Sequence, residues 1–369
     1  MDFSLTQAQT DLADLARQIL TDHSTPERLR ELDAAAIRFD DRLWAELAKA
    51  GVLSAALPES AGGAGLGLLE QCSVLIEAGR AVAAVPYLAT ITLGASALSR
   101  FGTPAQRALA QRAGAGSALL TAALAEDDSA DPRAPSTRAD PASGGWRLTG
   151  VKTAVPAGVI ADALLVPART PDGVAVFLVH AGDPDVKLAQ QQVTGGDAAA
   201  LVELGGCTAE LVGSLAEGPE ILDWLVAHGT VGLCALQLGL AERMLELTAD
   251  YAKRRVQFGK PIGSFQAVAQ RLADGFIDVE GIRLTLWQAA WRLASGLPCE
   301  TEVATAKFWA AEAGHRVAHT AVHVHGGVGI DLDGQVHRYF VAAKHNEFAL
   351  GGATAQLRSI GAALASGAV

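Results

Sequence analysis

The stretch Arg255-Val256-Gln257-Phe258-Gly259-Lys260-Pro261-Ile262 is the most informative part of this sequence. It follows a long helical pattern, and the run 253–255 places three positive charges in a chain whose formal net charge is −11. Concentrated positive charge beside an aromatic ring and a tight Gly-Lys-Pro turn suits a phosphate attached to a planar ring, as in a dinucleotide. The alternative is a basic helix end that interacts favourably with the helix dipole and binds nothing.

The composition limits the classes of protein that fit. The chain has 369 residues, of which 50% are hydrophobic and 19% are charged. This length allows two or three domains, each with its own core. The apolar content also favours a protein that buries surface between subunits. The net negative charge argues against nucleic acid as a partner, because binding to phosphate backbones needs extended positive surface.

The cysteines and the apolar segments indicate a compartment. The four cysteines lie far apart without C-x-x-C spacing, which predicts buried thiols in a reducing compartment and neither disulfides nor a zinc site. The N-terminus lacks a basic region followed by an apolar core, so no signal peptide is expected. The apolar stretch 231–241 is interrupted by Gln237 and is too short to span a bilayer. We expect a cytoplasmic protein with no membrane partner.

Hydrophobic periodicity divides the chain into three parts. Residues 1–118 show apolar positions at spacings of three and four, which predicts helices. Short apolar or alternating runs then follow, separated by turn residues, at 119–124, 146–151, 163–166, 174–179 and 186–193. This pattern predicts antiparallel β structure, a barrel or a sandwich, with a mobile loop over 127–145. From about residue 219 the helical period returns, with four long patterned segments that predict a four-helix bundle.

The order of these parts and several motifs resemble the acyl-CoA dehydrogenase family of flavoproteins over nearly the whole chain. The bundle carries Arg-x-x-Phe-Gly-Lys-Pro-Ile, and His325-Gly326-Gly327-Val328-Gly329 lies between its third and fourth helices. Further landmarks are Met1-Asp2-Phe3, Pro58–Gly63, Leu148–Lys152 and Val336–Phe340. The resemblance implies an α+β fold with an N-terminal all-α domain (1–118), a middle antiparallel β-barrel domain (119–218) and a C-terminal four-helix bundle (219–369) that makes FAD and subunit contacts.

The resemblance also implies a reaction and partners. In the family, a glutamate removes a proton from the carbon next to a CoA thioester while FAD takes a hydride from the next carbon. The electrons then pass to an electron-transferring flavoprotein. In the family's tetramers FAD lies between two subunits, one of which holds the flavin ring and supplies the base while its neighbour clamps the pyrophosphate and adenosine.

The residues of the neighbour's clamp are present in this sequence. By resemblance, Arg255 matches the arginine that meets the pyrophosphate, Phe258 the ring near the adenine end, and Gln266 a polar contact. The turn His323-Val324-His325-Gly326-Gly327 matches the backbone loop that approaches the phosphates, where glycines leave backbone N–H groups uncovered. His323 stands where the family usually has glutamine, and either side chain can donate a hydrogen bond.

The residues that hold the flavin ring are absent. The family's tryptophan falls on Ala154, and the threonine that reaches flavin N5 falls on Pro156, which has neither hydroxyl nor N–H. The base position after the fourth helix is Gly351. Some relatives carry the glutamate on the first bundle helix, where this chain has Gly229, and the arginine beside it falls on Thr230.

In lacking these residues, the chain resembles the non-catalytic subunit of heterotetrameric (α2β2) acyl-CoA dehydrogenases. Such enzymes act on bulky substrates such as CoA-linked steroid side chains. No catalytic residue is therefore assigned to this chain, and a homologous catalytic subunit is the expected partner. Two alternatives stay open. The chain could be a self-sufficient homotetrameric dehydrogenase with a relocated base, or a structural or regulatory member of the fold without a flavin site.

Other titratable residues favour plainer interpretations. Glu347 lies one turn before Gly351, and we expect it to be a surface charge and not a shifted base. Glu126 matches a glutamate that shapes the flavin loop, and we expect a structural role for it. The histidines at 315, 319 and 323 share one helix face, but no carboxylate stands at a suitable spacing to complete a metal site.

Overall fold

The computed structural model describes residues 6–129 and 131–367, so the landmark Met1-Asp2-Phe3 lies outside the described residues. Backbone contacts divide the chain into two compact units. The β unit comprises residues 30–71 and 84–229, and the bundle unit comprises the remaining described residues. The predicted boundaries of three sequential domains stay a prediction. Each unit is described by itself.

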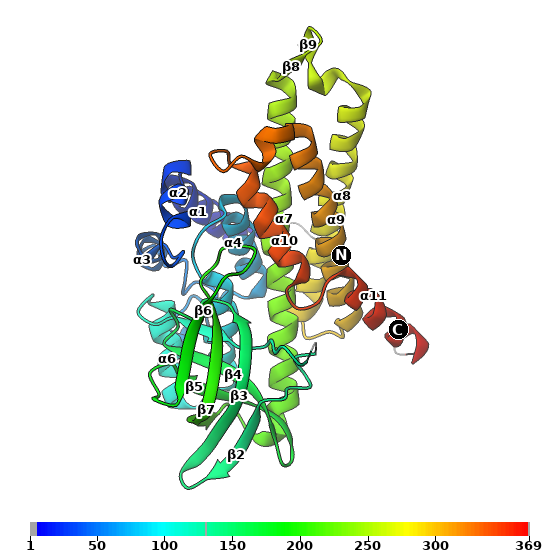
Figure 1. Cartoon of the computed structure of the whole chain (residues 1–369). Helices are drawn as coiled ribbons and strands as arrows, with labels where there is room; N and C mark the ends of the chain where they lie inside the picture. Colours follow the sequence, from blue (N-terminus) through cyan, green and yellow to red (C-terminus); the bar gives the residue numbers. More distant parts are fainter. Residues whose placement is uncertain (1–5, 130, 368–369) are drawn as a thin grey trace. The chain divides into compact units, whose positions relative to one another are not determined.

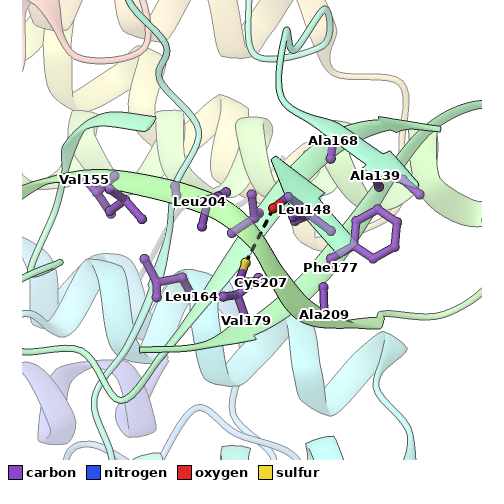
Figure 2. Packing of buried hydrophobic residues seen from close by; sticks show 14 of the residues in the cluster. Ala139, Leu148, Val155, Leu164, Ala168, Phe177, Val179, Leu204, Cys207 and Ala209 are labelled. Atoms are coloured by element: carbon purple, nitrogen blue, oxygen red, sulfur yellow. Dashed lines mark hydrogen bonds between the residues drawn. The ribbon is translucent and has the colours of Figure 1, made fainter. Parts of the chain in front are cut away.

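The β unit contains a closed barrel. Its strands are β1 (Leu120–Ala122), β2 (Arg138–Ala142), β3 (Gly145–Val155), β4 (Ala163–Thr170), β5 (Gly173–His180), β6 (Val186–Gln191) and β7 (Ala199–Leu211). The pairings run β4-β2-β3-β7-β5 and return to β4, while β6 pairs with β7 at the side. Inward-facing side chains fill the barrel, and Phe177 packs against Trp146 with ring centroids 5.4 Å apart. Figure 2 shows this core, in which the Cys207 thiol points toward the Leu148 carbonyl oxygen.

The barrel differs in three respects from the sequence-based expectation. The longest strand, β7, was not predicted, although its residues alternate between buried and exposed. The segment 127–145, expected to be a mobile loop, contains β2. The sheet is not wholly antiparallel, because β1 and β2 each pair with β4 in parallel. Short polar strands such as β2 are specified by their neighbours and not by their own hydrophobic pattern.

The N-terminal region is helical, as expected. Its helices are α1 (Gln7–His23), α2 (Pro26–Asp33), α3 (Asp41–Lys49), η1 (Glu59–Ala61), α4 (Leu68–Ala81), η2 (Leu88–Ala95), α5 (Ser96–Phe101) and α6 (Pro104–Gly114). Reciprocal capping boxes begin α1 at Thr6 and α6 at Thr103, which satisfies backbone N–H groups that have no partner within the helix. The segment η2 is a π-helix and is almost entirely buried.

Long helices dominate the C-terminal half (Figure 1). They are α7 (Gly218–Arg254), α8 (Gln266–Ala294), α9 (Glu300–His325), α10 (Val336–Phe348) and α11 (Ala353–Ala365). The first three match the predicted helices. The expected fourth helix is two helices, because the backbone turns at Leu350 and Gly351, which have φ values of +53° and +92°. Helix α9 contacts α8, α10 and α11.

Glycines and an ion-pair network bind α4 to α7 within the bundle unit. A Cβ at Gly239 would lie 1.9 Å from the Ile76 carbonyl oxygen, so only glycine permits this approach of the two backbones. Arg80 on α4 pairs with Glu242 and Glu246 on α7, each at 2.7 Å. The Tyr339 hydroxyl on α10 donates to the Arg80 carbonyl oxygen at 2.7 Å. These contacts hold α7 firmly up to the residues that precede the candidate site.

One helix is long and apolar enough to cross a membrane by length and composition alone. It covers Leu215–Arg254 and is therefore longer than the apolar stretch recognised in the sequence. Within its most apolar window, 78% of the residues are buried inside the protein, which is typical of a core helix.

Candidate cofactor-binding site

A β-hairpin with a two-residue loop follows α7 and contains the segment 255–262. Strands β8 (Val256–Gln257) and β9 (Lys260–Pro261) pair antiparallel, and the Ile262 amide donates to the Arg255 carbonyl oxygen at 2.8 Å. The loop residues Phe258 and Gly259 have φ values of +51° and +78°, as a type I′ turn requires. Glycine adopts this conformation freely, whereas phenylalanine adopts it at a cost. A strained aromatic residue at a hairpin tip indicates a function outside the hairpin.

The three cations at the end of α7 are not equivalent. Lys253 forms an ion pair with Asp250 at 3.3 Å, and the Arg254 side chain donates to the Asp250 carbonyl oxygen at 3.1 Å. Within the described part of the chain, the guanidinium of Arg255 has no hydrogen-bond or ion-pair partner. Arg255 is exposed and lines a pocket. It is therefore the cation of this cluster that is available to an anionic ligand.

The glycine-rich turn after α9 also lines the pocket. Helix α9 ends at His325, Gly326 has a φ of +65°, and a short 3-10 helix, η5 (Gly326–Ile330), follows. A Cβ added at Gly326 or Gly327 would meet no atom within 4 Å. The Cβ side of both glycines is thus open, so a ligand can come close to this backbone, although the Gly326 N–H itself already donates to the Val322 and His323 carbonyl oxygens.

Tyr251 and His325 form a stacked pair inside the pocket. Their ring centroids lie 4.4 Å apart with the planes inclined by 25°. The Nδ1 atom of His325 lies 2.8 Å from the Ala321 carbonyl oxygen, which can only accept, so Nδ1 carries the proton. Burial lowers the pKa of His325 below its usual value. His325 is therefore neutral at physiological pH and leaves Nε2 as a hydrogen-bond acceptor.

The pocket has a volume of about 750 Å³, which lies within the range of small-molecule sites. Six of the eight residues predicted to bind the cofactor line it, namely Arg255, His323, Val324, His325, Gly326 and Gly327. Sequence reasoning missed six further lining residues, which are Tyr251, Gln257, Ile262, Val328, Ile330 and Asp331. Tyr251 could have been found, because it stands one helical turn before Arg255 and so shares its helix face.

Two predicted contacts lie outside the pocket lining. Gln266 is exposed at the first position of α8. Phe258 is 93% exposed, and its ring makes a T-shaped contact with the ring of Phe265, with centroids 6.2 Å apart. Within the part of this chain that the structure describes, neither residue belongs to a closed site. Their predicted contacts with FAD stay predictions.

Replacing Phe258 by asparagine should change stability and ligand binding in opposite directions. Asparagine tolerates the left-handed conformation and removes an exposed aromatic ring, so we expect the free energy of unfolding to rise by about 0.5–1 kcal/mol. Loss of the ring should weaken cofactor retention in any complex that uses it. Chemical denaturation and flavin absorbance measure the two effects. Val256→Thr, an exposed substitution at an ordinary backbone position, is the matched control, and a destabilised Phe258→Asn variant would contradict the account.

The positions that resemble the flavin-ring contacts are occupied by an internally bonded turn of the β unit. The Ala154 amide donates to Gln191 Oε1 at 2.6 Å, and the Thr121 hydroxyl donates to the Pro156 carbonyl oxygen at 2.5 Å. Ala154 and Ala157 have φ values of +46° and +56°. The polar backbone groups of this turn bond within the protein, and its side chains are too small to cover an aromatic ring system.

Neither position for a catalytic base carries a carboxylate. Gly229 is buried within α7, and Gly351 lies in the turn between α10 and α11. Glu347 is not the surface charge that the sequence suggested. Its side chain is only 13% exposed and pairs with Lys344 at 2.5 Å and with His315 at 3.2 Å. A carboxylate paired in this way with a lysine is a poor candidate for a relocated base.

The histidines of α9 do not converge on a metal site. The rings of His315 and His319 lie 4.3 Å apart, whereas His323 lines the cofactor pocket. Over residues 6–129 and 131–367, no group of three or more histidine, cysteine, aspartate or glutamate side chains is arranged to hold a metal ion.

A buried lysine fixes the end of α10. Lys307 on α9 is 1% exposed and donates through Nζ to the carbonyl oxygens of Asn346 and Glu347, at 2.8 and 3.1 Å. Burial lowers the pKa of Lys307 to about 8, although the charge of Glu347 opposes the shift. The ammonium group thus donates hydrogen bonds to carbonyl oxygens in the last turn of α10, which have no partner within the helix.

The low pKa of Lys307 predicts a pH dependence of stability. Between pH 8 and the unfolded pKa of 10.5, the folded protein releases this proton while the unfolded chain keeps it, so stability rises with pH. Relative to Lys307→Met, the wild type should gain about 2–3 kcal/mol between pH 7 and pH 10. Urea denaturation at both pH values measures the difference. A difference between the two proteins that does not change with pH would contradict the assignment.

These residues fit the adenosine and pyrophosphate end of FAD. Arg255, whose guanidinium has no partner among the described residues, and the exposed glycine turn line one pocket of suitable size, and a neutral histidine supplies an acceptor for a hydroxyl or amino group. The fit concerns the nucleotide tail alone.

Comparisons with known proteins identify the family of the chain. Residues 6–111 match the N-terminal domain of acyl-CoA dehydrogenases, and residues 216–365 match the C-terminal domain. The chain is 51% identical to acyl-CoA dehydrogenase FadE27 of Mycobacterium tuberculosis, over 99% of each chain.

Solved structures give the same result. A chain of the ChsE4-ChsE5 complex from Mycobacterium tuberculosis matches with a TM-score of 0.95 and 52% identity over 99% of both chains. A chain of the Tcur3481-Tcur3483 steroid acyl-CoA dehydrogenase matches with a TM-score of 0.93 and 43% identity over 98% of both chains. Butyryl-CoA dehydrogenase from Megasphaera elsdenii matches with a TM-score of 0.89 and 28% identity. The chain belongs to the acyl-CoA dehydrogenase family.

Proposed function

We propose that this chain is one subunit of a heteromeric, FAD-dependent acyl-CoA dehydrogenase that introduces an α,β double bond into an acyl-CoA thioester. It clamps the pyrophosphate and adenosine of an FAD molecule whose flavin ring a homologous catalytic subunit holds. When bound, FAD accepts the hydride. The partner supplies the base, and this chain supplies binding and orientation of the cofactor.

The observation that carries the proposal is the unequal state of the two half-sites. The pocket is lined by Arg255, whose guanidinium has no partner among the described residues, and by the exposed glycine turn after α9. A structural member of the fold has no need for a free cation beside an exposed backbone. By contrast, both base positions, Gly229 and Gly351, are glycine. Loss of positioned general-base catalysis costs on the order of 10² to 10⁴ in rate.

The substrate class follows from the relatives. One similar structure is described as a steroid acyl-CoA dehydrogenase of two different chains, and another is the ChsE4-ChsE5 complex. We infer a bulky acyl-CoA, such as a steroid side-chain thioester, with electrons passed to an electron-transferring flavoprotein. A cytoplasmic location stays part of the proposal, and cell fractionation would test it.

The experiment compares the chain alone with the chain co-expressed with its homologous partner. Alone, it should be nearly colourless and inactive toward acyl-CoA thioesters. Co-expressed, it should form a yellow complex that reduces an artificial electron acceptor. Oxidation of acyl-CoA by the purified chain alone would instead favour a homotetramer with a relocated base. A partner subunit that keeps its flavin and activity in the absence of this chain would favour a structural or regulatory role for the chain.

A further inference from the structure

The turn between α10 and α11 carries Gly351 at the position where relatives place the catalytic glutamate, and its backbone is unusual. Leu350 and Gly351 have successive positive φ values of +53° and +92°. The Gly351 amide donates to the Phe348 carbonyl oxygen at 3.1 Å, which closes the turn. A residue with a side chain rarely adopts a φ of +92°, so this backbone itself disfavours any residue other than glycine.

A side chain from α11 occupies the space beside Gly351. The Gln356 amide donates to the carbonyl oxygens of Leu350 and Gly351, at 3.1 and 3.2 Å. A Cβ added to Gly351 would lie 3.0 Å from Gln356 Nε2 and 3.3 Å from the Ala355 Cβ. Both distances are shorter than most Cβ contacts, so the Gln356 side-chain amide would have to shift by a few tenths of an ångström against its two acceptors.

Hydrogen bonds also fix the ends of the two helices that flank the turn. Lys307 donates to the carbonyl oxygens of Asn346 and Glu347, which lie in the last turn of α10. At the start of α11, the backbone N–H groups of Ala355 and Gln356 both donate to the Gly352 carbonyl oxygen. The turn is therefore anchored by a buried cation on one side and by an amide side chain on the other.

We propose that Gln356 and Lys307 are positioning residues that lock the α10–α11 turn in a conformation from which position 351 cannot present a side chain. The base position of this chain is thus closed by its backbone, and not only by replacement of glutamate with glycine. A single Gly351→Glu substitution would not restore a working site. The inference rests on the proposed function for its meaning, because it explains how this subunit stays non-catalytic.

Thermal unfolding of the full-length chain tests the lock without reference to flavin or activity. Gly351→Ala should lower the Tm by about 1–3 °C, because alanine is strained at this φ. The matched control is Gly361→Ala, inside α11, where the added Cβ meets nothing within 4 Å and φ is ordinary. This control should leave the Tm unchanged or raise it. If Gly351→Ala behaved like Gly361→Ala, the backbone would not be locked and the proposal would fail.

A double-mutant cycle tests the part played by Gln356. Gln356→Ala removes the amide that a new Cβ would meet, so the double variant with Gly351→Ala should lose less Tm than the two single variants together. Strictly additive losses would show that the amide does not oppose a side chain at 351.

Hydrogen exchange tests Lys307, because Lys307→Met should speed exchange of amides 349–352 at least tenfold relative to those of α8. Unchanged exchange would remove Lys307 from the proposal.

The consequence for activity is tested in the complex with the partner subunit. Gly351→Glu in this chain should add no second active site and no flavin beyond that of the wild-type complex. A gain of turnover would overturn the proposal directly. Failure of the proposed function would give a different result, namely dehydrogenase activity of the wild-type chain alone. That result would not change the outcomes of the unfolding and hydrogen-exchange experiments.

Discussion

We expect Lys152→Met to lower the free energy of unfolding by about 3–5 kcal/mol, because it leaves a buried carboxylate without its counter-ion. Lys152 on β3 is fully buried, and its Nζ lies 2.5 Å from Glu126 Oε1, whose side chain is 2% exposed. The hydroxyls of Ser136 and Thr137 donate to the same carboxylate, each at 2.6 Å. This network ties the segment after β1 to the barrel, which is the structural role expected for Glu126.

The same network predicts acid sensitivity. Burial alone would raise the pKa of Glu126, but hydrogen bonds from Lys152, Ser136 and Thr137 outweigh it and lower the pKa to about 2. The stabilisation is complete above pH 4.5 and is lost as the pH falls toward 2. Guanidinium denaturation should therefore show that the free energy of unfolding of the wild type falls between pH 6 and pH 3. The Glu126→Gln variant should not show this fall.

A surface lysine provides the control for this prediction. Lys187→Met on β6 removes an exposed lysine from the same unit and should change stability by less than about 0.5 kcal/mol. The double variant Glu126→Gln/Lys152→Met should be more stable than Lys152→Met alone, because it removes the unpaired charge. Equal effects of Lys152→Met and Lys187→Met would refute the assignment.

Arg255→Ala should weaken FAD retention in the heteromeric complex about 10- to 100-fold, as expected for loss of a charge-assisted hydrogen bond to phosphate. The chain itself should unfold at the same denaturant concentration, because the Arg255 side chain has no partner among the described residues. Arg255→Lys should retain part of the affinity, because it keeps the charge and loses the planar fork. Equilibrium dialysis with fluorescence detection of released FAD measures these affinities.

Lys253→Ala is the matched control for the arginine, since it removes one positive charge two residues away. Lys253 is paired with Asp250, so its loss should change FAD affinity by less than a factor of about three at 0.15 M salt. Equal losses from both variants would mean that general positive charge, and not a specific clamp, attracts the cofactor.

The helical parts of the fold were predictable because long periodic segments carry their own signal. The pattern over α7 recurs for many turns, so its helix was found without reference to neighbours. The break between α10 and α11 was missed, because paired glycines are compatible with either a helix end or a flexible helix, and the lock depends on Gln356 from beyond the turn. Strand β2 was missed because its burial comes from its partners in the barrel.

The candidate site was predictable where a motif is contiguous and not where it depends on packing. Arg255 and the glycine turn after α9 stand in recognisable runs of sequence. The spacing of Tyr251 from Arg255 places both residues on one helix face, but no local pattern reports that the Tyr251 ring stacks on His325, which lies 74 positions later in the chain. Whether Phe258 joins the site depends on atoms beyond this chain, since the ring is exposed within it.

The most direct test of the division of labour is the flavin content of the purified heteromeric complex. Native mass spectrometry, combined with absorbance of FAD released on denaturation, gives the number of flavins per pair of different chains. One FAD per pair, lost together with Arg255, is the result that the account predicts. Two FAD molecules per pair, or one bound to each chain purified separately, would contradict it.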